Sequence, residues 1–167
     1  MKIALAADHR GQSAKSKIAV LLAELGHQVL DMGTNSTQSC DYPDLAYPAA
    51  RAVADSKVDA AILICGSGIG MTICANKVRG VRAALCHDEL TAQMSRRHND
   101  ANVLCLASDV LGDELMRRIV RGWLSTTFDG GGRHERRVRK VAWIEEGKDP
   151  RNYDESNGLS DADNRDL

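Results

Sequence analysis

A run of six apolar residues, Ala60–Cys65, is followed directly by the glycine-rich segment Gly66–Gly70. Consecutive apolar residues are typical of a strand that helices cover on both faces, as in parallel sheets. The three glycines at alternate positions allow a tight turn, and a helical stretch to about Lys77 follows them. This junction predicts the strand–turn–helix unit from which α/β proteins are built.

The same alternation of apolar runs and helical periodicity recurs along the chain. It predicts strands at Lys2–Ala7, His27–Met32, Ala60–Cys65, Val81–Cys86 and Val103–Ala107. It predicts helices at Gln12–Leu25, from about Pro48 to Ala54, from the glycine turn to Lys77, from Asp88 to about Asn99, at Asp113–Ser125 and from about His134 to Glu146. Five strands alternating with helices predict a single-domain, three-layer α/β fold with a doubly wound, Rossmann-like parallel sheet and right-handed crossovers.

Composition limits the classes of protein to which the chain can belong. The 22 Lys and Arg residues nearly cancel the 23 Asp and Glu residues, which disfavours a general nucleic-acid-binding protein. No apolar stretch approaches the roughly 18 residues of a membrane span, and Asp8–Arg10 interrupt the N-terminal apolar run before a signal peptide can form. We therefore expect a cytoplasmic protein with no membrane partner, whose five cysteines are reduced thiols.

The last part of the chain differs in composition from the rest. Residues Lys148–Leu167 lack periodicity, are rich in Asp and Asn, and hold few residues that could join a core. The sequence therefore predicts one domain over residues 1–147 and a mobile polar tail over residues 148–167.

Ligands of doubly wound sheets bind beyond the carboxyl ends of the strands. The loops expected at that edge are Asp8–Gly11, Gly33–Asp44, Gly66–Gly70 and the region after the fourth strand. The helix that starts behind the glycine turn points free N–H groups and its positive dipole end into the same space, so the turn can hold a phosphate or a developing oxyanion. Cys65 lies immediately before the turn, where this field favours the thiolate. The alternative is a tight structural connection with Cys65 in the core.

Two histidines are further candidates for chemistry at this edge. Asp8 and His9 end the first strand, and a carboxylate beside an imidazole suits proton transfer or hydroxyl binding. Asp8 could instead only cap the following helix. His98 lies at a helix end before the fifth strand, and we expect the fold to bring it to the same edge. The alternative is a structural or solvated histidine.

The densest positive run is Arg133–Lys140. On a helix Arg133, Arg137 and Lys140 share one stripe, which could bind a phosphate through charge-assisted hydrogen bonds. A solvated basic face and a polyanion site are the alternatives.

The other cysteines and the histidine spacings give no sign of a metal centre. Cys74, Cys86 and Cys105 lie among apolar neighbours and are interpreted as core residues. Neither C-x-x-C nor H-x-x-x-H spacing occurs, so a zinc site has little support.

Six segments, in order along the chain, resemble the ribose-5-phosphate isomerase B family, which also includes allose-6-phosphate and galactose-6-phosphate isomerases. The resemblance covers roughly residues 1–147. The segments are Ala7–Gly11, Asp41–Asp44, Ile64–Gly70, Ala75–Lys77, Ser95–Val103 and Gly131–His134.

This resemblance implies interconversion of ribose 5-phosphate and ribulose 5-phosphate through an enediolate, with neither a metal nor another cofactor. It implies that Cys65 is the base that moves a proton between C2 and C1, and that His98 assists opening of the furanose ring. The N–H groups of the turn would stabilise the enediolate. The substrate-binding residues that it implies are Asp8, His9, Gly66, Ser67, Gly68, Gly70, Asn99, Arg133 and Arg137. The family builds each site from two subunits, so a homodimer or a dimer of dimers is implied.

The chain also departs from the family pattern. Met71 stands where one branch has a glutamate, which favours Cys65 as the base, and Ser67 stands where threonine is frequent. Asp109 stands where many members have an arginine that binds phosphate. A carboxylate would repel a phosphate, so either Asp109 points away or the substrate differs from the usual one.

Three alternative functions remain open at this point. An isomerase of allose 6-phosphate, galactose 6-phosphate or a tetrose phosphate would explain Asp109. A nucleotide-binding domain is suggested only by Gly66-x-Gly68-x-Gly70, whose spacing departs from G-x-G-x-x-G. A non-catalytic protein could use the Arg133–Lys140 face to bind an acidic partner or RNA.

Overall fold

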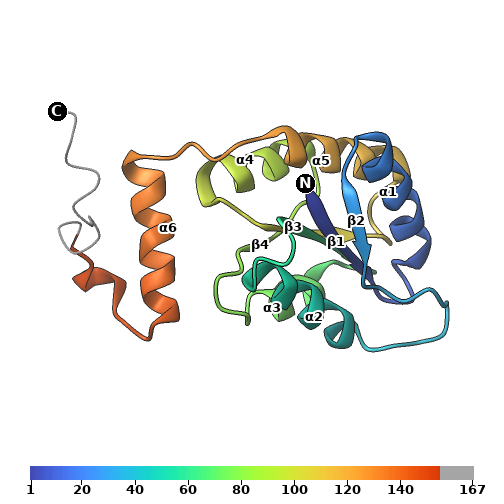
Figure 1. Cartoon of the computed structure of the whole chain (residues 1–167), viewed down its shortest axis with the longest axis horizontal. Helices are drawn as coiled ribbons and strands as arrows, with labels where there is room; N and C mark the ends of the chain where they lie inside the picture. Colours follow the sequence, from blue (N-terminus) through green and yellow to red (C-terminus); the bar gives the residue numbers. More distant parts are fainter. Residues whose placement is uncertain (155–167) are drawn as a thin grey trace. The chain divides into compact units, whose positions relative to one another are not determined.

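The computed structural model describes residues 1–154. These residues fall into a core unit, Met1–Phe128, and a C-terminal unit that begins at Asp129. The core unit contains a five-stranded parallel sheet in the order β2-β1-β3-β5-β4 (Figure 1). The strands are β1 (Lys2–Ala7), β2 (Gln28–Asp31), β3 (Ala60–Cys65), β4 (Ala83–Leu85) and β5 (Val103–Ala107). The predicted parallel α/β sheet is therefore confirmed.

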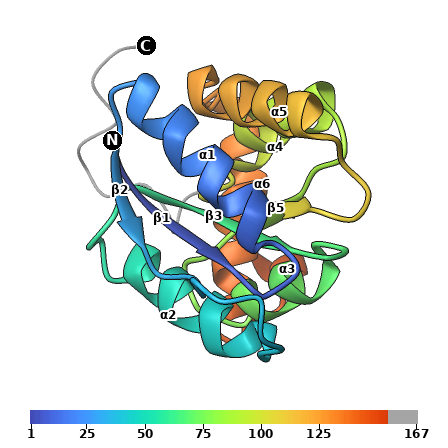
Figure 2. The same ribbon diagram turned by 90° about the vertical axis from the view of Figure 1, so that its right-hand side faces the viewer.

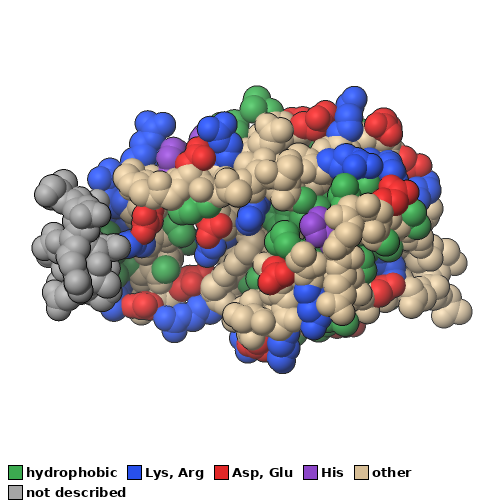
Figure 3. Space-filling view, turned by 45° about the horizontal axis from the view of Figure 1, so that its top comes forward, with side chains coloured by type: hydrophobic (Ala, Val, Ile, Leu, Met, Phe, Trp, Pro, Cys, Tyr) green, Lys and Arg blue, Asp and Glu red, His purple; other side chains and the backbone are tan. Residues whose placement is uncertain are grey.

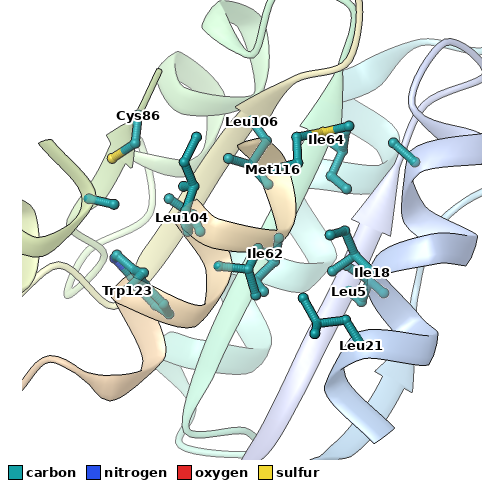
Figure 4. Packing of buried hydrophobic residues seen from close by; sticks show 14 of the residues in the cluster. Leu5, Ile18, Leu21, Ile62, Ile64, Cys86, Leu104, Leu106, Met116 and Trp123 are labelled. Carbon is teal, nitrogen blue, oxygen red and sulfur yellow. The ribbon is translucent and has the colours of Figure 1, made fainter. Parts of the chain in front are cut away.

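Helices cover both faces of this sheet (Figure 2). One face packs against α1 (Gln12–Glu24), α4 (Glu89–Asn99) and α5 (Asp113–Ser125). The other face packs against α2 (Tyr42–Ala54) and α3 (Ile69–Ala75). Figure 4 shows the first of these cores, in which Ile62 lies between Leu104 and the Leu5 and Ile18 side chains. The consecutive apolar residues of β1, β3 and β5 are buried because helices lie above and below them.

The second helix begins earlier than predicted. α2 starts at Tyr42, so the predicted loop Gly33–Asp44 ends at Asp41, and Pro48 lies inside the helix rather than near its first turn. Pro43 occupies the first turn, where a missing N–H leaves no hydrogen bond unmade and the fixed φ suits a helix.

The C-terminal unit contains α6 (Gly132–Glu145), which has no fully buried residue. The chain then folds back onto this helix: the Tyr153 ring meets Trp143 edge-on, with ring centroids 5.2 Å apart, and Lys148 Nζ lies 4.3 Å from the Trp143 centroid. Residues 148–154, predicted as the start of a mobile tail, thus contact α6. The rest of the predicted tail, 155–167, lies outside the described residues, and the domain boundary at 147 stays a prediction.

The surface of the core unit mixes charges of both signs, as the balanced composition suggests. In Figure 3 Lys and Arg side chains lie among Asp and Glu side chains. Ion pairs such as Arg118–Glu89, 3.0 Å apart, join neighbouring helices. Within residues 1–154, no helix combines the length and the apolar character that crossing a membrane requires.

The parallel arrangement brings the carboxyl ends of the three central strands to one edge of the sheet. Asp8 N–H donates to the Ile64 carbonyl (3.1 Å), which joins the loop after β1 to β3. Asp109 N–H donates to the Gly66 carbonyl (3.0 Å), which joins the loop after β5 to the glycine turn. The loop after β5 was not among those predicted at this edge, although it contacts the turn directly.

Candidate active site

Cys65 is the last residue of β3, and its sulfur faces the glycine turn. The residue is almost fully buried, at 4% exposed, and Gly68 N–H donates a hydrogen bond of 3.2 Å to the Sγ atom. Ser67 is exposed at the tip of the turn, where its Oγ accepts from Ile69 N–H (3.3 Å). The turn therefore holds one sulfur and one hydroxyl against backbone amides, and Cys65 also belongs to the hydrophobic core on the α2 and α3 side of the sheet.

The glycines of the turn are required by conformation and by close contacts. Gly68 has φ +73°, and a Cβ there would lie 2.4 Å from Leu85 Cδ1 and 3.1 Å from the Leu106 backbone. A Cβ on Gly70 would lie 2.7–2.9 Å from the Tyr42 ring. The ring of Tyr42, from the Asp41–Asp44 segment, thus closes over the turn. Tyr42 was not among the predicted site residues, although its segment carried part of the family resemblance.

Replacing Gly68 with alanine is expected to lower the free energy of unfolding by about 2 kcal/mol, because it adds a close contact to the strain of a positive φ. Urea unfolding would measure this loss. Gly80→Ala is the matched control: Gly80 has φ +82°, and nothing lies within 4 Å of its added Cβ. We expect that variant to lose only about 1 kcal/mol. Equal losses in the two variants would show that the packing around Gly68 is not the cause.

Asp8 and His9 lie in the loop after β1, at the same edge as Cys65. Asp8 is buried, and its Oδ1 accepts from the N–H groups of Arg10 (2.9 Å) and Gly11 (3.1 Å). Both donors lie in the loop before α1, whose N-cap is Gly11 and is made without a side-chain hydrogen bond, so this carboxylate holds the loop and does not cap the helix. His9 Nδ1 accepts from Cys40 N–H (3.3 Å), so the neutral ring carries its proton on Nε2. That nitrogen is left as a donor.

His98 and Asn99 lie at the opposite edge of the sheet. They end α4, which leads into β5, and the carbonyl of Asn102 accepts from Ala61 N–H (3.1 Å) near the start of β3. Cys65 lies four residues further along β3, about 13 Å at the usual rise per residue. The expectation that one chain brings His98 to the Cys65 edge is therefore wrong, because a helix that precedes a parallel strand ends at the amino edge of the sheet.

Asp109, which departs from the family pattern, is paired with a residue that the sequence analysis did not single out. Its Oδ2 accepts from Arg10 Nε (2.7 Å) and lies 2.6 Å from Arg10 Nη2. The two residues are far apart in the sequence. Only their positions after two strands of the same parallel sheet could have suggested the pair.

The remaining cysteines behave as core residues. Burial raises the pKa of the Cys105 thiol to about 12, and it also raises the pKa values of Cys74 and Cys86. Their thiols stay protonated at neutral pH, which does not suit a base or a nucleophile. Cys86 and Cys105 are fully buried, and Cys74 packs against the core under α2 and α3. The prediction of core residues is confirmed for Cys86 and Cys105, whereas Cys74 is partly buried at the margin of the core.

Two predicted phosphate ligands lie in the C-terminal unit. Arg133 and Arg137 are exposed and one turn apart on α6, and Arg133 Nε donates to His134 Nε2 (3.4 Å). Their role in binding stays a prediction. Over residues 1–154, no group of three or more His, Cys, Asp or Glu side chains is arranged to hold a metal ion.

Comparison with known proteins identifies the family. Residues 3–141 match the family model described as Ribose/Galactose Isomerase. Ribose-5-phosphate isomerase B of Escherichia coli K12 is 47% identical over 145 residues, which cover 87% of this chain and 97% of that protein. D-erythrulose-4-phosphate isomerase of Pectobacterium atrosepticum is 42% identical over 146 residues, which cover 87% of this chain and 95% of that protein.

A solved structure agrees with the fold. Clostridium thermocellum ribose-5-phosphate isomerase B matches with a TM-score of 0.86 and 46% identity, covering 88% of this chain and 99% of that chain. Sequence and fold thus give the same assignment over most of the chain. The chain belongs to the ribose/galactose isomerase family and is an aldose–ketose isomerase of the ribose-5-phosphate isomerase B type.

Proposed function

We propose that this chain interconverts ribose 5-phosphate and ribulose 5-phosphate through an enediolate, without a metal or other cofactor, and that Cys65 is the base. The relatives from E. coli and C. thermocellum are named for ribose 5-phosphate, which supports this substrate. The observation that carries the role of Cys65 is the 3.2 Å hydrogen bond from Gly68 N–H to its sulfur. The proposal includes the cytoplasmic location expected from the sequence.

The reaction needs a base at carbon and a group that stabilises charge on oxygen, because a proton beside a carbonyl is only weakly acidic. Cys65 as a thiolate takes the proton from C2 of the aldose and returns it to C1, while the proton of the C2 hydroxyl passes to the C1 oxygen. Of the amides in the turn, Gly68 N–H donates to the sulfur and Ile69 N–H to Ser67 Oγ. The N–H groups of Gly66 and Ser67 have no acceptor within residues 1–154, so they are available to the enediolate oxygen.

His98 assists ring opening, and it comes from a second copy of the chain. Leu90, Met94 and His98 follow one another at four-residue spacing, so they share one face of α4. Leu90 is 65% and Met94 42% exposed, which leaves an apolar stripe leading to His98 uncovered in the single chain. α3, which follows the glycine turn, also exposes Ile69 and Ile73.

A two-fold dimer would bury these apolar residues. A symmetric contact applies to both copies, so the α4 face of each chain could lie against the α3 side of the other. Each glycine turn would then face the other chain's His98. The separation of Cys65 and His98 within one chain supports this arrangement.

The other substrate contacts follow from the family pattern. His9 and Asn99 would bind sugar hydroxyls, with His9 donating from Nε2, and Asp8 would hold the loop in place as well as face the substrate. Arg133 and Arg137 would bind the phosphate. Because the phosphate is remote from C1 and C2, its binding energy serves mainly to position the substrate.

A panel of phosphosugars assayed for aldose–ketose interconversion tests the proposed substrate. We expect kcat/KM for ribose 5-phosphate to exceed that for allose 6-phosphate, galactose 6-phosphate and a tetrose phosphate by about tenfold or more, because each added or missing carbon misplaces either the phosphate or the reacting carbons. The tetrose phosphate is the alternative favoured by the Pectobacterium relative. A higher kcat/KM for any other sugar would reassign the substrate.

A further inference from the structure

The ion pair between Arg10 and Asp109 stands beside the glycine turn and has no part in the function proposed above. Arg10 follows β1 and Asp109 follows β5, so the pair reaches across the carboxyl end of β3, which lies between those strands. Both contacts go to one carboxylate oxygen: Nε lies 2.7 Å and Nη2 2.6 Å from Asp109 Oδ2.

The backbone holds this pair in a fixed position relative to Cys65. Ser108 N–H donates to the Cys65 carbonyl (2.9 Å), and Asp109 N–H donates to the Gly66 carbonyl (3.0 Å). The Ser108 hydroxyl lies 3.2 Å from the Arg10 carbonyl oxygen and 3.1 Å from that of Cys65. The three loops are thereby joined around the residue proposed as the base.

Gly66 allows the pair to approach the turn. A Cβ at this position would lie 2.6 Å from Asp109 Oδ2 and 2.8 Å from Arg10 Nε. The guanidinium therefore lies against Gly66, the residue that directly follows Cys65.

The ion pair with Asp109 does not use all the N–H donors of the Arg10 guanidinium, so some of them can bind a ligand. Arg10 has five N–H donors in a planar fork, and its side chain is 57% exposed. Nη1 has no hydrogen-bond partner within the described part of the chain. The hydrogen bond that Arg10 donates to Asp109 and the negative charge of that carboxylate raise the pKa of Arg10 further, so the group stays charged. Asp109 thus orients a cation whose free side can bind an anion.

We propose that Arg10 binds and positions the phosphate of the substrate at the core unit, and that Asp109 is its positioning residue. This inference rests on the proposed function for the identity of the ligand. A guanidinium binds a phosphate dianion through paired, charge-assisted hydrogen bonds. The carboxylate of Asp109 repels the dianion on one side, which directs the phosphate to the Nη1 side of the fork.

The Arg10→Gln variant tests this proposal. We expect its KM for ribose 5-phosphate to rise about 10- to 100-fold while kcat changes less than about threefold, since a charge-assisted contact remote from the reacting carbons is lost. The matched control is Arg118→Gln, because Arg118 is also an exposed arginine (53%) paired with a carboxylate, that of Glu89. The control should keep the wild-type KM. An unchanged KM in Arg10→Gln would overturn the inference.

The Arg10→Gln/Asp109→Asn variant separates phosphate binding by Arg10 from the effect of leaving the Asp109 carboxylate unpaired. If KM rises in Arg10→Gln only because the charge of Asp109 is left unpaired beside the turn, the second change removes that charge and should restore KM. If Arg10 binds phosphate, KM should stay raised, with a recovery of at most about threefold from the lost repulsion. Full recovery would overturn the inference.

Titration with inorganic phosphate tests phosphate binding by Arg10 independently of the proposed isomerase activity. Calorimetry should show about tenfold weaker phosphate binding by Arg10→Gln than by the wild-type protein, whatever sugar the enzyme isomerises. A wild-type protein that isomerises ribose 5-phosphate but binds phosphate equally well with and without Arg10 would refute only the inference. Phosphate binding that depends on Arg10, without isomerase activity on any phosphosugar, would refute only the proposed function. No phosphate binding by the wild-type protein would overturn the inference.

Discussion

Replacing Cys65 with alanine is expected to lower kcat for ribose 5-phosphate about a thousandfold, within the range for loss of a positioned base. KM should change less than about threefold, because the proposed role of the sulfur is at the carbon that loses its proton and not in binding the sugar or the phosphate. Initial rates of ketose formation over a range of substrate concentrations measure both constants. A variant that keeps most of the wild-type kcat would exclude Cys65 as the base.

The matched control is Cys74→Ala, which removes a thiol from the helix that follows the turn without touching Cys65. It should keep kcat within about twofold, because Cys74 only packs against the core. Cys65→Ala also removes the acceptor of the Gly68 N–H, so its urea unfolding must be measured beside its activity. If Cys65→Ala unfolds as the wild-type protein does, its loss of kcat reports on chemistry rather than on stability.

The central strands could be predicted from the sequence because burial on both faces leaves a continuous apolar run. β1, β3 and β5 have the bounds that their apolar runs predicted. β2 and β4 lie at the two edges of the sheet and are shorter than predicted, since apolar residues beside an edge strand do not all pair with a neighbour. The sequence pattern indicates which residues are apolar, whereas backbone hydrogen bonding to a neighbouring strand decides where a strand ends.

The start of α2 could not be placed from local signals. Pro43 and Pro48 carry the same signal for a helix start, and only one of them lies in the first turn. Tertiary packing decides between them: Ala46, Ala49 and Ala50 are fully buried against the sheet, which extends the helix back past Pro48. A proline inside a helix is tolerated when such packing offsets the lost hydrogen bond.

The parts of the candidate site that lie close together in the sequence could be predicted from it. Cys65 and Gly68 are three residues apart, and the strand–turn–helix pattern contains both. The pairing of Arg10 with Asp109 depends on strand order, which the sequence did not predict. The position of His98, by contrast, could have been predicted from the sequence. The alternation of helices and strands already implies that a helix before a parallel strand ends at the amino edge of the sheet.

A heterodimer of two inactive variants is expected to regain activity if His98 acts on the site of the partner chain. Alone, Cys65→Ala lacks the base in both sites, and His98→Gln lacks the ring-opening group in both, so each should keep about 1% of the wild-type kcat or less. In a heterodimer with shared sites, one site has both changes and the other has neither. The purified heterodimer should therefore show about half of the wild-type kcat per dimer.

Coexpression of the two variants with different affinity tags, followed by purification on both tags in turn, isolates this heterodimer. A site built within one chain gives the opposite result, since each site would then carry one change and activity would stay near that of the single variants. The matched control pairs Cys65→Ala with Cys65→Ala under the two tags, which excludes an effect of tagging or of copurified host enzyme. His98 ends α4 about 13 Å or more from Cys65 along the sheet of its own chain, so we expect the first result.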